Sequence, residues 1–204
     1  MGVFIFGRCT LKNKIIIIEG YPASGKSTFA RTLSKTFNVP CMQKDELKTA
    51  ICKTISVTNI EESRFYSAVT FDAMMYVAER QMETNSPIII EGNFVPAGVK
   101  KIDESLAIKT LIEEYSYRSL TFKFAGETRV LHKRYIERDK LPERGGVNDF
   151  YRGFSYTEYN KICRSQDSFN VGGEVIRINT TDFKAVDYNS HIETARLFLQ
   201  GIPV

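Results

Sequence analysis

Short, purely apolar runs alternate along this chain with longer segments in which apolar residues recur every three or four positions. The short runs predict strands that are buried on both faces, and the longer segments predict helices that bury one side. The clearest strands are 15–18 and 88–90, because consecutive isoleucines favour extended backbone. Both runs continue into Glu-Gly, which places a glycine turn at the carboxyl end of each strand.

The remaining elements follow from the same two patterns. Further strands are expected at 39–42, 120–124 and 174–178. Helices are expected at 28–37, from 43 onward, and at 61–82, 101–115, 127–141, 151–169 and 186–200. Strands that alternate with helices predict an α/β, doubly wound parallel sheet, and no linker divides residues 1–204, so a single domain is expected. Ligands bind such sheets at the carboxyl ends of the strands.

The residues after the first strand form a full phosphate-loop motif, G-x-x-x-x-G-K-[ST]. Its glycines allow close backbone approach, so that amide groups and a helix dipole converge on phosphate oxygens. Lys26 is expected to reach the β- and γ-phosphates, and Ser27 to ligate Mg²⁺. The alternative is a glycine-rich turn with a surface lysine. The predicted nucleotide-binding set is Gly20, Tyr21, Pro22, Ala23, Ser24, Gly25, Lys26, Ser27 and Thr28.

The bulk composition narrows the function classes. A chain of 204 residues with 43% hydrophobic and 25% charged residues is typical of one globular α/β domain. Its net charge of +4 suits a site for small polyanions, and it is too low for a dedicated nucleic-acid binder. No apolar run approaches the roughly 20 residues that span a bilayer, and the start resembles neither a signal peptide nor a myristoylation site.

The cysteines and histidines argue against a zinc site or a histidine-based triad. Cys9, Cys41, Cys52 and Cys163 form no C-x-x-C pair, which favours reduced thiols in a cytoplasmic protein. The histidines lie far apart in the sequence. Residues 1–13 are consistent with an extra edge strand or with a tail.

Two acidic residues follow predicted strands at the edge where phosphates are expected. Asp45 is interpreted as a general base that takes a proton from an acceptor hydroxyl, although Asp is equally a common N-cap. Glu91 is interpreted as the acidic partner that holds Mg²⁺. The alternative is a charge that only emerges at a strand end, as at Glu19.

The segment 127–153 is predicted to be a lid. Arg134 and Arg138 share a helix face with apolar residues, so they are expected to point inward and clamp a transferring phosphoryl group. A solvated helix with pairs such as Arg134–Glu137 is the alternative. Gly145 and Gly146 offer a hinge. An aromatic cluster could stack a base, but helix packing is more typical: Phe150, Tyr151, Phe154, Tyr156 and Tyr159.

Together, IIIIEGYPASGKST, the Asp45 region, IIIEGNF and FAGETRVLHKRYIER resemble P-loop kinases of the nucleoside-monophosphate-kinase-like fold. The resemblance spans about 15–178 and is closest to ATP-binding proteins related to zeta toxin, chloramphenicol phosphotransferase and 5′-polynucleotide kinase. It implies a five-stranded sheet in the order 2-3-1-4-5, ATP as donor and Mg²⁺. Asp45, Arg134 and Arg138 match the family's acidic residue and lid arginines. Glu143–Gly146 departs from the R-H-P-like ending of some relatives.

The resulting hypothesis is an ATP- and Mg²⁺-dependent kinase that phosphorylates a hydroxyl of a small molecule, with catalytic residues Lys26, Asp45, Arg134 and Arg138. A 5′-hydroxyl polynucleotide kinase and a regulatory ATP-binding protein are the alternatives. The acceptor is not identified by any spacing in the sequence; the segments 56–82 and 93–100 are expected to line its site.

Overall fold

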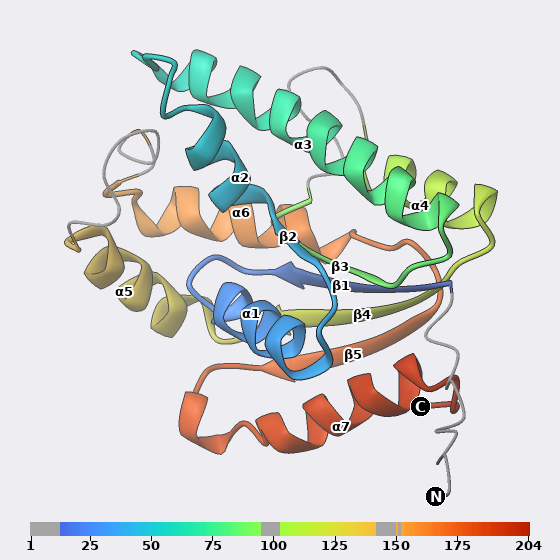
Figure 1. Ribbon diagram of the computed structural model, residues 1–204. Coiled ribbons are helices and arrows are strands. Elements are labelled where there is room, and N and C mark those ends of the chain that lie inside the picture. Colours follow the sequence, from blue (N-terminus) through green and yellow to red (C-terminus); the bar gives the residue numbers. More distant parts are fainter. Residues whose placement is uncertain (1–12, 95–102, 142–149, 151) are drawn as a thin grey trace, which may run out of the picture.

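The computed structural model (Figure 1) describes residues 13–94, 103–141, 150 and 152–204. Its strands form one parallel sheet, in which the order β2-β3-β1-β4-β5 confirms the expected topology. The strands are β1 (Lys14–Gly20), β2 (Cys41–Gln43), β3 (Ile88–Glu91), β4 (Arg118–Ala125) and β5 (Glu174–Asn179).

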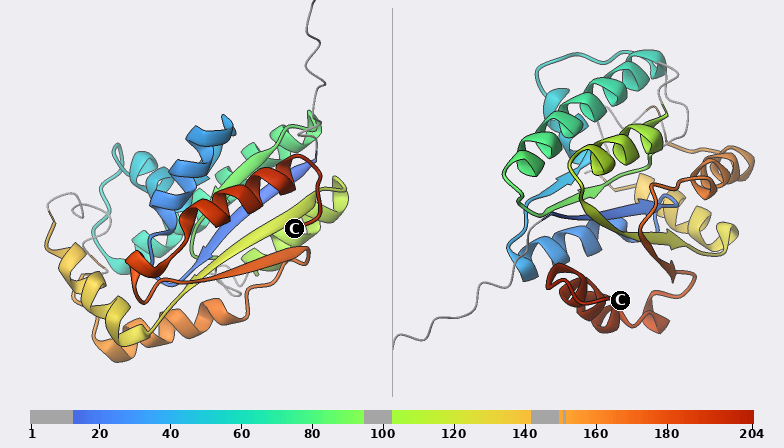
Figure 2. Two further views of the ribbon diagram at one scale, coloured as in Figure 1. Left: turned by 90° about the horizontal axis from the view of Figure 1, so that it is seen from below. Right: turned by 90° about the vertical axis from the view of Figure 1, so that its right-hand side faces the viewer.

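Helices cover both faces of the sheet. They are α1 (Lys26–Phe37), α2 (Lys44–Ile51), α3 (Ile60–Glu83), α4 (Glu104–Glu114), α5 (Thr128–Asp139), α6 (Tyr156–Asp167), the 3₁₀ helix η3 (Phe183–Ala185) and α7 (Tyr188–Leu199). Helices α1 and α7 lie on one side, and Figure 2 shows them together in front of the strands in its left view. Helices α3 and α4 lie on the opposite side (Figure 1).

The isoleucine runs are continuous because successive residues enter different cores. Ile15 and Ile17 pack with α3 and α4, whereas Ile16 and Ile18 pack with α1 and α7. All four side chains are at most 1% exposed, as a central parallel strand requires. The matching run of β3 lies in register beside β1, with Ile89 opposite Ile16.

Several element ends differ from the prediction for local reasons. Strand β2 begins at Cys41 rather than at 39, since Asn38 has a left-handed conformation and Pro40 has no amide hydrogen. Helix α6 begins at Tyr156 rather than at 151, because Ser155 and Glu158 form a capping box. That motif is readable in the sequence and would have placed the helix start correctly. Helix η3 was not predicted.

The carboxyl ends of the strands lie along one edge of the sheet, toward the left of Figure 1. Helices α1, α2 and α5 begin at this edge, after β1, β2 and β4. None of the described helices combines the length and the apolar character needed to cross a bilayer. Cys41, Cys52 and Cys163 are free thiols, whereas Cys9 and the rest of 1–12 lie outside the described residues.

Candidate functional site

The loop between β1 and α1 is shaped by residues with positive φ. Gly20 has φ 124°, and a Cβ there would lie 2.0 Å from the carbonyl oxygen of Phe124 on β4. The amide of Tyr21 donates to that same oxygen at 2.9 Å. Gly25, at φ 92°, forms the N-cap of α1. The glycines therefore permit close contact with β4 and a turn into the helix, as the motif predicts.

Lys26 folds back over this loop. Its ammonium donates hydrogen bonds of 2.8 Å to the carbonyl oxygens of Gly20 and Tyr21. Burial lowers the pKa of Lys26, while the carboxylates of Glu91 and Asp45 oppose that shift. A buried cation surrounded by loop backbone attracts an anion strongly, because little solvent screens its charge.

Glu91 ends β3 beside the first turn of α1. The side-chain amide of Gln43 bridges the two elements, donating to Glu91 Oε2 and to the carbonyl oxygen of Ser27, both at 3.1 Å. Burial raises the pKa of Glu91, and nearby Asp45 adds to the rise, while Lys26 opposes it. The Glu91 carboxylate is 5% exposed, so it does not simply emerge into solvent.

Ser27 and Glu91 are the candidate protein ligands for Mg²⁺. The described residues contain no group of three His, Cys, Asp or Glu side chains suited to a metal. Mg²⁺ bound to a nucleotide, however, takes most of its ligands from phosphate and water, and needs one or two protein oxygens. The Ser27 hydroxyl and the Glu91 carboxylate fit this role, since a buried carboxylate repelled by a second one is stabilised by a cation.

The orientation of helix α2 is set by two buried lysines, Lys44 and Lys48, and leaves Asp45 facing the cavity. Lys44 donates to both carboxylate oxygens of Glu104 at 2.5 and 2.6 Å, and Lys48 donates to Ser63 at 2.7 Å. These lysines are one turn apart and face inward, whereas Asp45 is exposed. The N-cap of α2 is Gln43, so the alternative interpretation of Asp45 as an N-cap is wrong.

Arg134 is half-buried and points toward the loop after β5. Its guanidinium donates to the carbonyl oxygens of Thr180 and Thr181 at 2.5 Å and lies 4.0 Å from the centre of the Phe183 ring. Within the described part of the chain it forms no ion pair with Glu137, so the solvated-helix alternative does not describe it. Arg138 lies one turn further along α5, over the Tyr135 ring.

These side chains line one cavity of about 560 Å³. It brings together five residues predicted from four separate segments: Lys26, Asp45, Glu91, Arg134 and Arg138. Of the predicted loop set, Pro22, Ala23, Ser24, Gly25, Ser27 and Thr28 also line it. Gly20 and Tyr21 do not, because their backbone lies beneath the loop against β4.

The cavity also contains residues that the sequence analysis missed. Phe183 lies against Gly25, whose added Cβ would be 3.3 Å from the ring. Phe183 lies in the 3₁₀ helix η3, which has only three residues and therefore leaves no periodic pattern in the sequence. The other missed residues in the lining are Arg31, Glu137 and Leu141, whereas Asn93 belongs to the segment 93–100 that was expected near the acceptor.

The described members of the aromatic cluster lie outside the cavity lining. Of its members, Phe150, Phe154, Tyr156 and Tyr159 are described, and none of these lines the cavity. Tyr159 is buried beside Tyr135 and Leu131 under the phosphate loop. Tyr151, Arg144, Gly145 and Gly146 lie outside the described residues.

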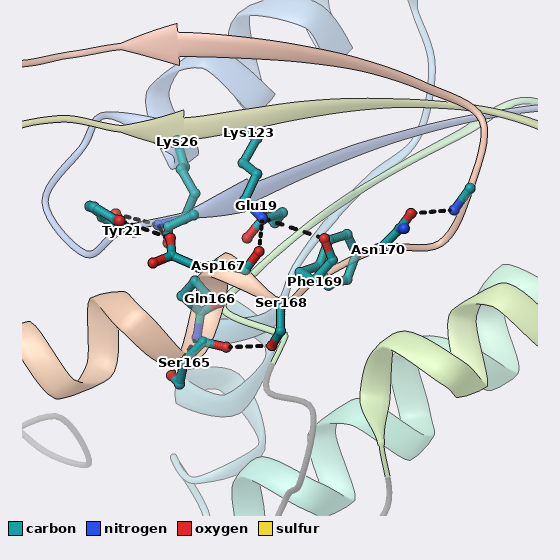
Figure 3. A network of polar contacts seen from close by, with 12 residues as sticks. Glu19, Tyr21, Lys26, Lys123, Ser165, Gln166, Asp167, Ser168, Phe169 and Asn170 are labelled. Carbon is teal, nitrogen blue, oxygen red and sulfur yellow. Dashed lines mark hydrogen bonds and ion pairs between the residues drawn. The ribbon is translucent and has the colours of Figure 1, made fainter.

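A polar network runs from the buried pair Glu19 and Lys123 to the exposed Asp167 beneath the loop (Figure 3). Glu19 is completely buried, so the prediction that it emerges at a strand end is wrong. Its carboxylate lies 3.4 Å from the ammonium of Lys123, which donates to the Asp167 carbonyl oxygen at 2.9 Å. The Tyr21 hydroxyl donates to the Asp167 carboxylate at 2.8 Å. The signal available in the sequence was a charged residue near the carboxyl end of each of two largely apolar strands, Glu19 in β1 and Lys123 in β4.

No protein-family model and no curated protein matches the sequence. Solved structures do resemble the fold. A candidate kinase from Chloroflexus aurantiacus is 20% identical with a TM-score of 0.76, covering 94% of this chain and 99% of its own. A shikimate kinase from Bacteroides thetaiotaomicron is 14% identical with a TM-score of 0.52, covering 91% and 98%. Kti12 from Chaetomium thermophilum, solved with ADP-AlF3, is 12% identical with a TM-score of 0.57, covering 89% and 97%.

These likenesses establish that the chain has the α/β fold of P-loop kinases, with the sheet order described above. At such low identity they establish the fold alone. The more particular resemblance to zeta toxin, chloramphenicol phosphotransferase and 5′-polynucleotide kinase stays a prediction.

Proposed function

We propose that this protein is a Mg²⁺- and ATP-dependent phosphotransferase that moves the γ-phosphoryl group to a hydroxyl of a small molecule. The observation that carries the proposal is the shared cavity of Lys26, Asp45, Glu91, Arg134 and Arg138. A phosphate loop alone serves binding, whereas an additional carboxylate and two arginines facing it are the parts of a transfer site.

The nucleotide is held by the phosphate loop. Amide groups from Ala23 to Thr28 and the N-terminus of α1 bind the phosphates, and Lys26 neutralises their charge. Phe183 offers the base an apolar ring at the edge of the cavity, beside Gly25. The shikimate kinase and the ADP-AlF3 complex among the structural neighbours support a nucleotide together with a small acceptor.

Ser27 and Glu91 would hold Mg²⁺ at this site. When bound, the ion supplies positive charge that neutralises the phosphate oxygens during transfer. Gln43 keeps the Glu91 carboxylate and the start of α1 together through its two hydrogen bonds.

Asp45 receives the proton of the acceptor hydroxyl as the new oxygen–phosphorus bond forms. The bond between the γ-phosphorus and the bridging oxygen breaks, and its electron pair leaves with ADP. Arg138, which also lines the cavity, stabilises the charge on the transferring group. Arg134 contributes once its donors are released from the Thr180 and Thr181 carbonyls.

The proposal also treats the chain as one kinase-like domain with a cytoplasmic location and a lid at 127–153. Of this lid, the structure describes residues 127–141, 150, 152 and 153. The residues of the segment 95–102, expected near the acceptor, lie outside the described part. A polynucleotide acceptor is less favoured, since the net charge of +4 is modest.

The test is transfer of a labelled γ-phosphoryl group from ATP to pooled nucleosides, sugars, aminoglycosides and 5′-hydroxyl oligonucleotides. Lys26→Ala serves as the blank, and a product that it lacks identifies both the activity and the acceptor class. Asp45→Asn is expected to reduce transfer by about 10²- to 10⁴-fold and to leave ADP binding nearly unchanged. Glu46→Gln is the matched control, since Glu46 neighbours Asp45 and is exposed, and its carboxylate pairs with Arg31 without itself lining the cavity.

Binding of ATP without a labelled product from any acceptor would contradict the kinase proposal and favour a regulatory nucleotide-binding protein. Equal losses of transfer and of ADP affinity in Asp45→Asn would contradict the role of Asp45 as the base.

A further inference from the structure

The carbonyl groups of the phosphate loop are held away from the phosphates by hydrogen bonds. A loop can turn its amides toward an anion only if its carbonyls point elsewhere and find donors. Lys26 donates to the carbonyls of Gly20 and Tyr21, and the Ser24 hydroxyl donates to Tyr21 at 2.6 Å. Both donors belong to the loop motif itself.

The carbonyl of Pro22 receives its hydrogen bond from outside the motif. The Tyr159 hydroxyl, on helix α6, donates to this oxygen at 2.8 Å. The two residues are 137 positions apart in the sequence, so this contact exists only in the folded chain. A second hydrogen bond joins the loop to the same helix, since the Tyr21 hydroxyl donates to the carboxylate of Asp167 at the end of α6.

Tyr159 is fixed well enough to act as a support. Its side chain is 0% exposed, and its ring lies 5.4 Å from that of Tyr135 and 5.2 Å from that of His132. Burial also raises the pKa of Tyr159, so the hydroxyl keeps the proton that it donates. The ring position therefore aims one hydrogen-bond donor at the loop.

The residue after Pro22 needs such support. Ala23 has φ 59°, a left-handed conformation that is unfavourable for a residue with a Cβ. Its side chain packs into the same cluster as Tyr159, together with Leu131 and Tyr135. The packing of Ala23 and the hydrogen bond to Pro22 thus hold the loop at its strained residue.

We propose that Tyr159 is a positioning residue, whose hydroxyl holds the phosphate loop in its anion-binding conformation and thereby links helix α6 to nucleotide affinity. The inference rests on the proposed nucleotide binding. It assigns no contact between Tyr159 and the nucleotide, because Tyr159 lies beneath the loop and outside the cavity lining.

Tyr159→Phe tests this by removing one oxygen while the ring stays packed. The Kd for MgADP, measured by calorimetry, is expected to rise about three- to tenfold. Tyr117→Phe is the matched control: Tyr117 is also buried and donates to a backbone carbonyl, that of Ser86, at 2.9 Å away from the cavity. Both variants should lose similar thermal stability, and only Tyr159→Phe should lose affinity.

A second variant distinguishes loop positioning from a general structural role. Ala23→Gly makes the left-handed conformation accessible without support, so Tyr159→Phe should weaken MgADP binding less in that background than in the wild type. Equal Kd values for Tyr159→Phe and Tyr117→Phe, or an undiminished loss in the Ala23→Gly background, would overturn the inference. Absence of nucleotide binding to the wild type would overturn the proposed function and this inference with it.

Discussion

The ammonium of Lys123 lies 3.4 Å from the carboxylate of Glu19, and both side chains are buried beneath the phosphate loop. They occupy paired positions on β4 and β1. Lys123 also donates to the Asp167 carbonyl at the end of α6, so its charge serves the helix end as well as the carboxylate. Because Glu19 is buried, its pKa is raised to about 7, although the charges of Lys123 and Lys26 oppose the shift.

Glu19 should make the protein less stable as the pH rises toward neutrality. Its pKa rises from 4.5 to about 7 on folding, so the folded state binds more protons than the unfolded state between these values. The stabilisation is complete below about pH 4.5 and is lost as pH rises to about 7, a difference of about 3 kcal/mol. Urea unfolding across this range should show that Glu19→Gln flattens the decline.

The control for this pH experiment is Glu174→Gln, which removes a carboxylate paired with Arg118 at the surface. It should leave the slope of the wild type unchanged. Identical slopes for the wild type and Glu19→Gln would show that Glu19 titrates near its usual pKa in the folded protein.

Gly20→Ala should destabilise the fold strongly. The new Cβ would meet the Phe124 carbonyl oxygen at 2.0 Å, and both atoms belong to a rigid sheet. A loss of about 3 kcal/mol or more in the free energy of unfolding is expected. Gly201→Ala is the control, since its φ is also positive but its Cβ would meet nothing within 4 Å; a similar loss in both variants would contradict the clash.

Glu104→Gln should cost much more stability than its surface counterpart. It leaves the ammonium of Lys44 buried between α2 and α4 without its carboxylate, for which about 3 to 5 kcal/mol is typical. Glu46→Gln breaks an exposed pair with Arg31 and should change the free energy of unfolding by about 1 kcal/mol or less. Thermal and urea unfolding of both variants measure this difference in the free energy of unfolding. Small losses in both variants would contradict the prediction.

Arg134→Lys should fail to replace arginine at the β5–η3 loop. One planar guanidinium serves two carbonyls and lies against Phe183, and an ammonium cannot reproduce that fork. A loss of about 1 to 2 kcal/mol in unfolding free energy is expected for the lysine variant. Arg129→Lys, at an exposed arginine of the same helix, should change stability little; equal effects would place Arg134 among ordinary surface residues.

Glu91→Gln should weaken the binding of Mg²⁺ together with the nucleotide. The carboxylate is the buried charge beside Ser27, so its loss should raise the Mg²⁺ concentration for half-maximal ATP binding about tenfold. In the wild type, that concentration should also rise as pH falls, because the raised pKa of Glu91 means that protons compete with the ion. An unchanged Mg²⁺ titration in the variant would exclude Glu91 as a ligand.

The strand positions were predictable because a strand buried on both faces carries apolar residues at consecutive positions. The isoleucines of β1 and β3 satisfy that rule, and their order in the sheet agrees with the family resemblance. The start of α6 was missed although Ser155 and Glu158 mark it, since the aromatic residues before them suggested a longer helix. Here a local capping signal outweighs hydrophobic periodicity.

By itself, the sequence determined the strand positions, the phosphate loop and the acidic and basic candidates for the site, because each follows from local backbone preference, a contiguous motif or a place beside a strand end. Only the tertiary structure decided that Tyr159 supports Pro22, that Arg134 lies on Phe183, and that Glu19 is buried against Lys123. These pairs join residues distant in the sequence, and their burial sets their charge and their hydrogen bonds. Such contacts arise from packing between elements, which no local pattern records.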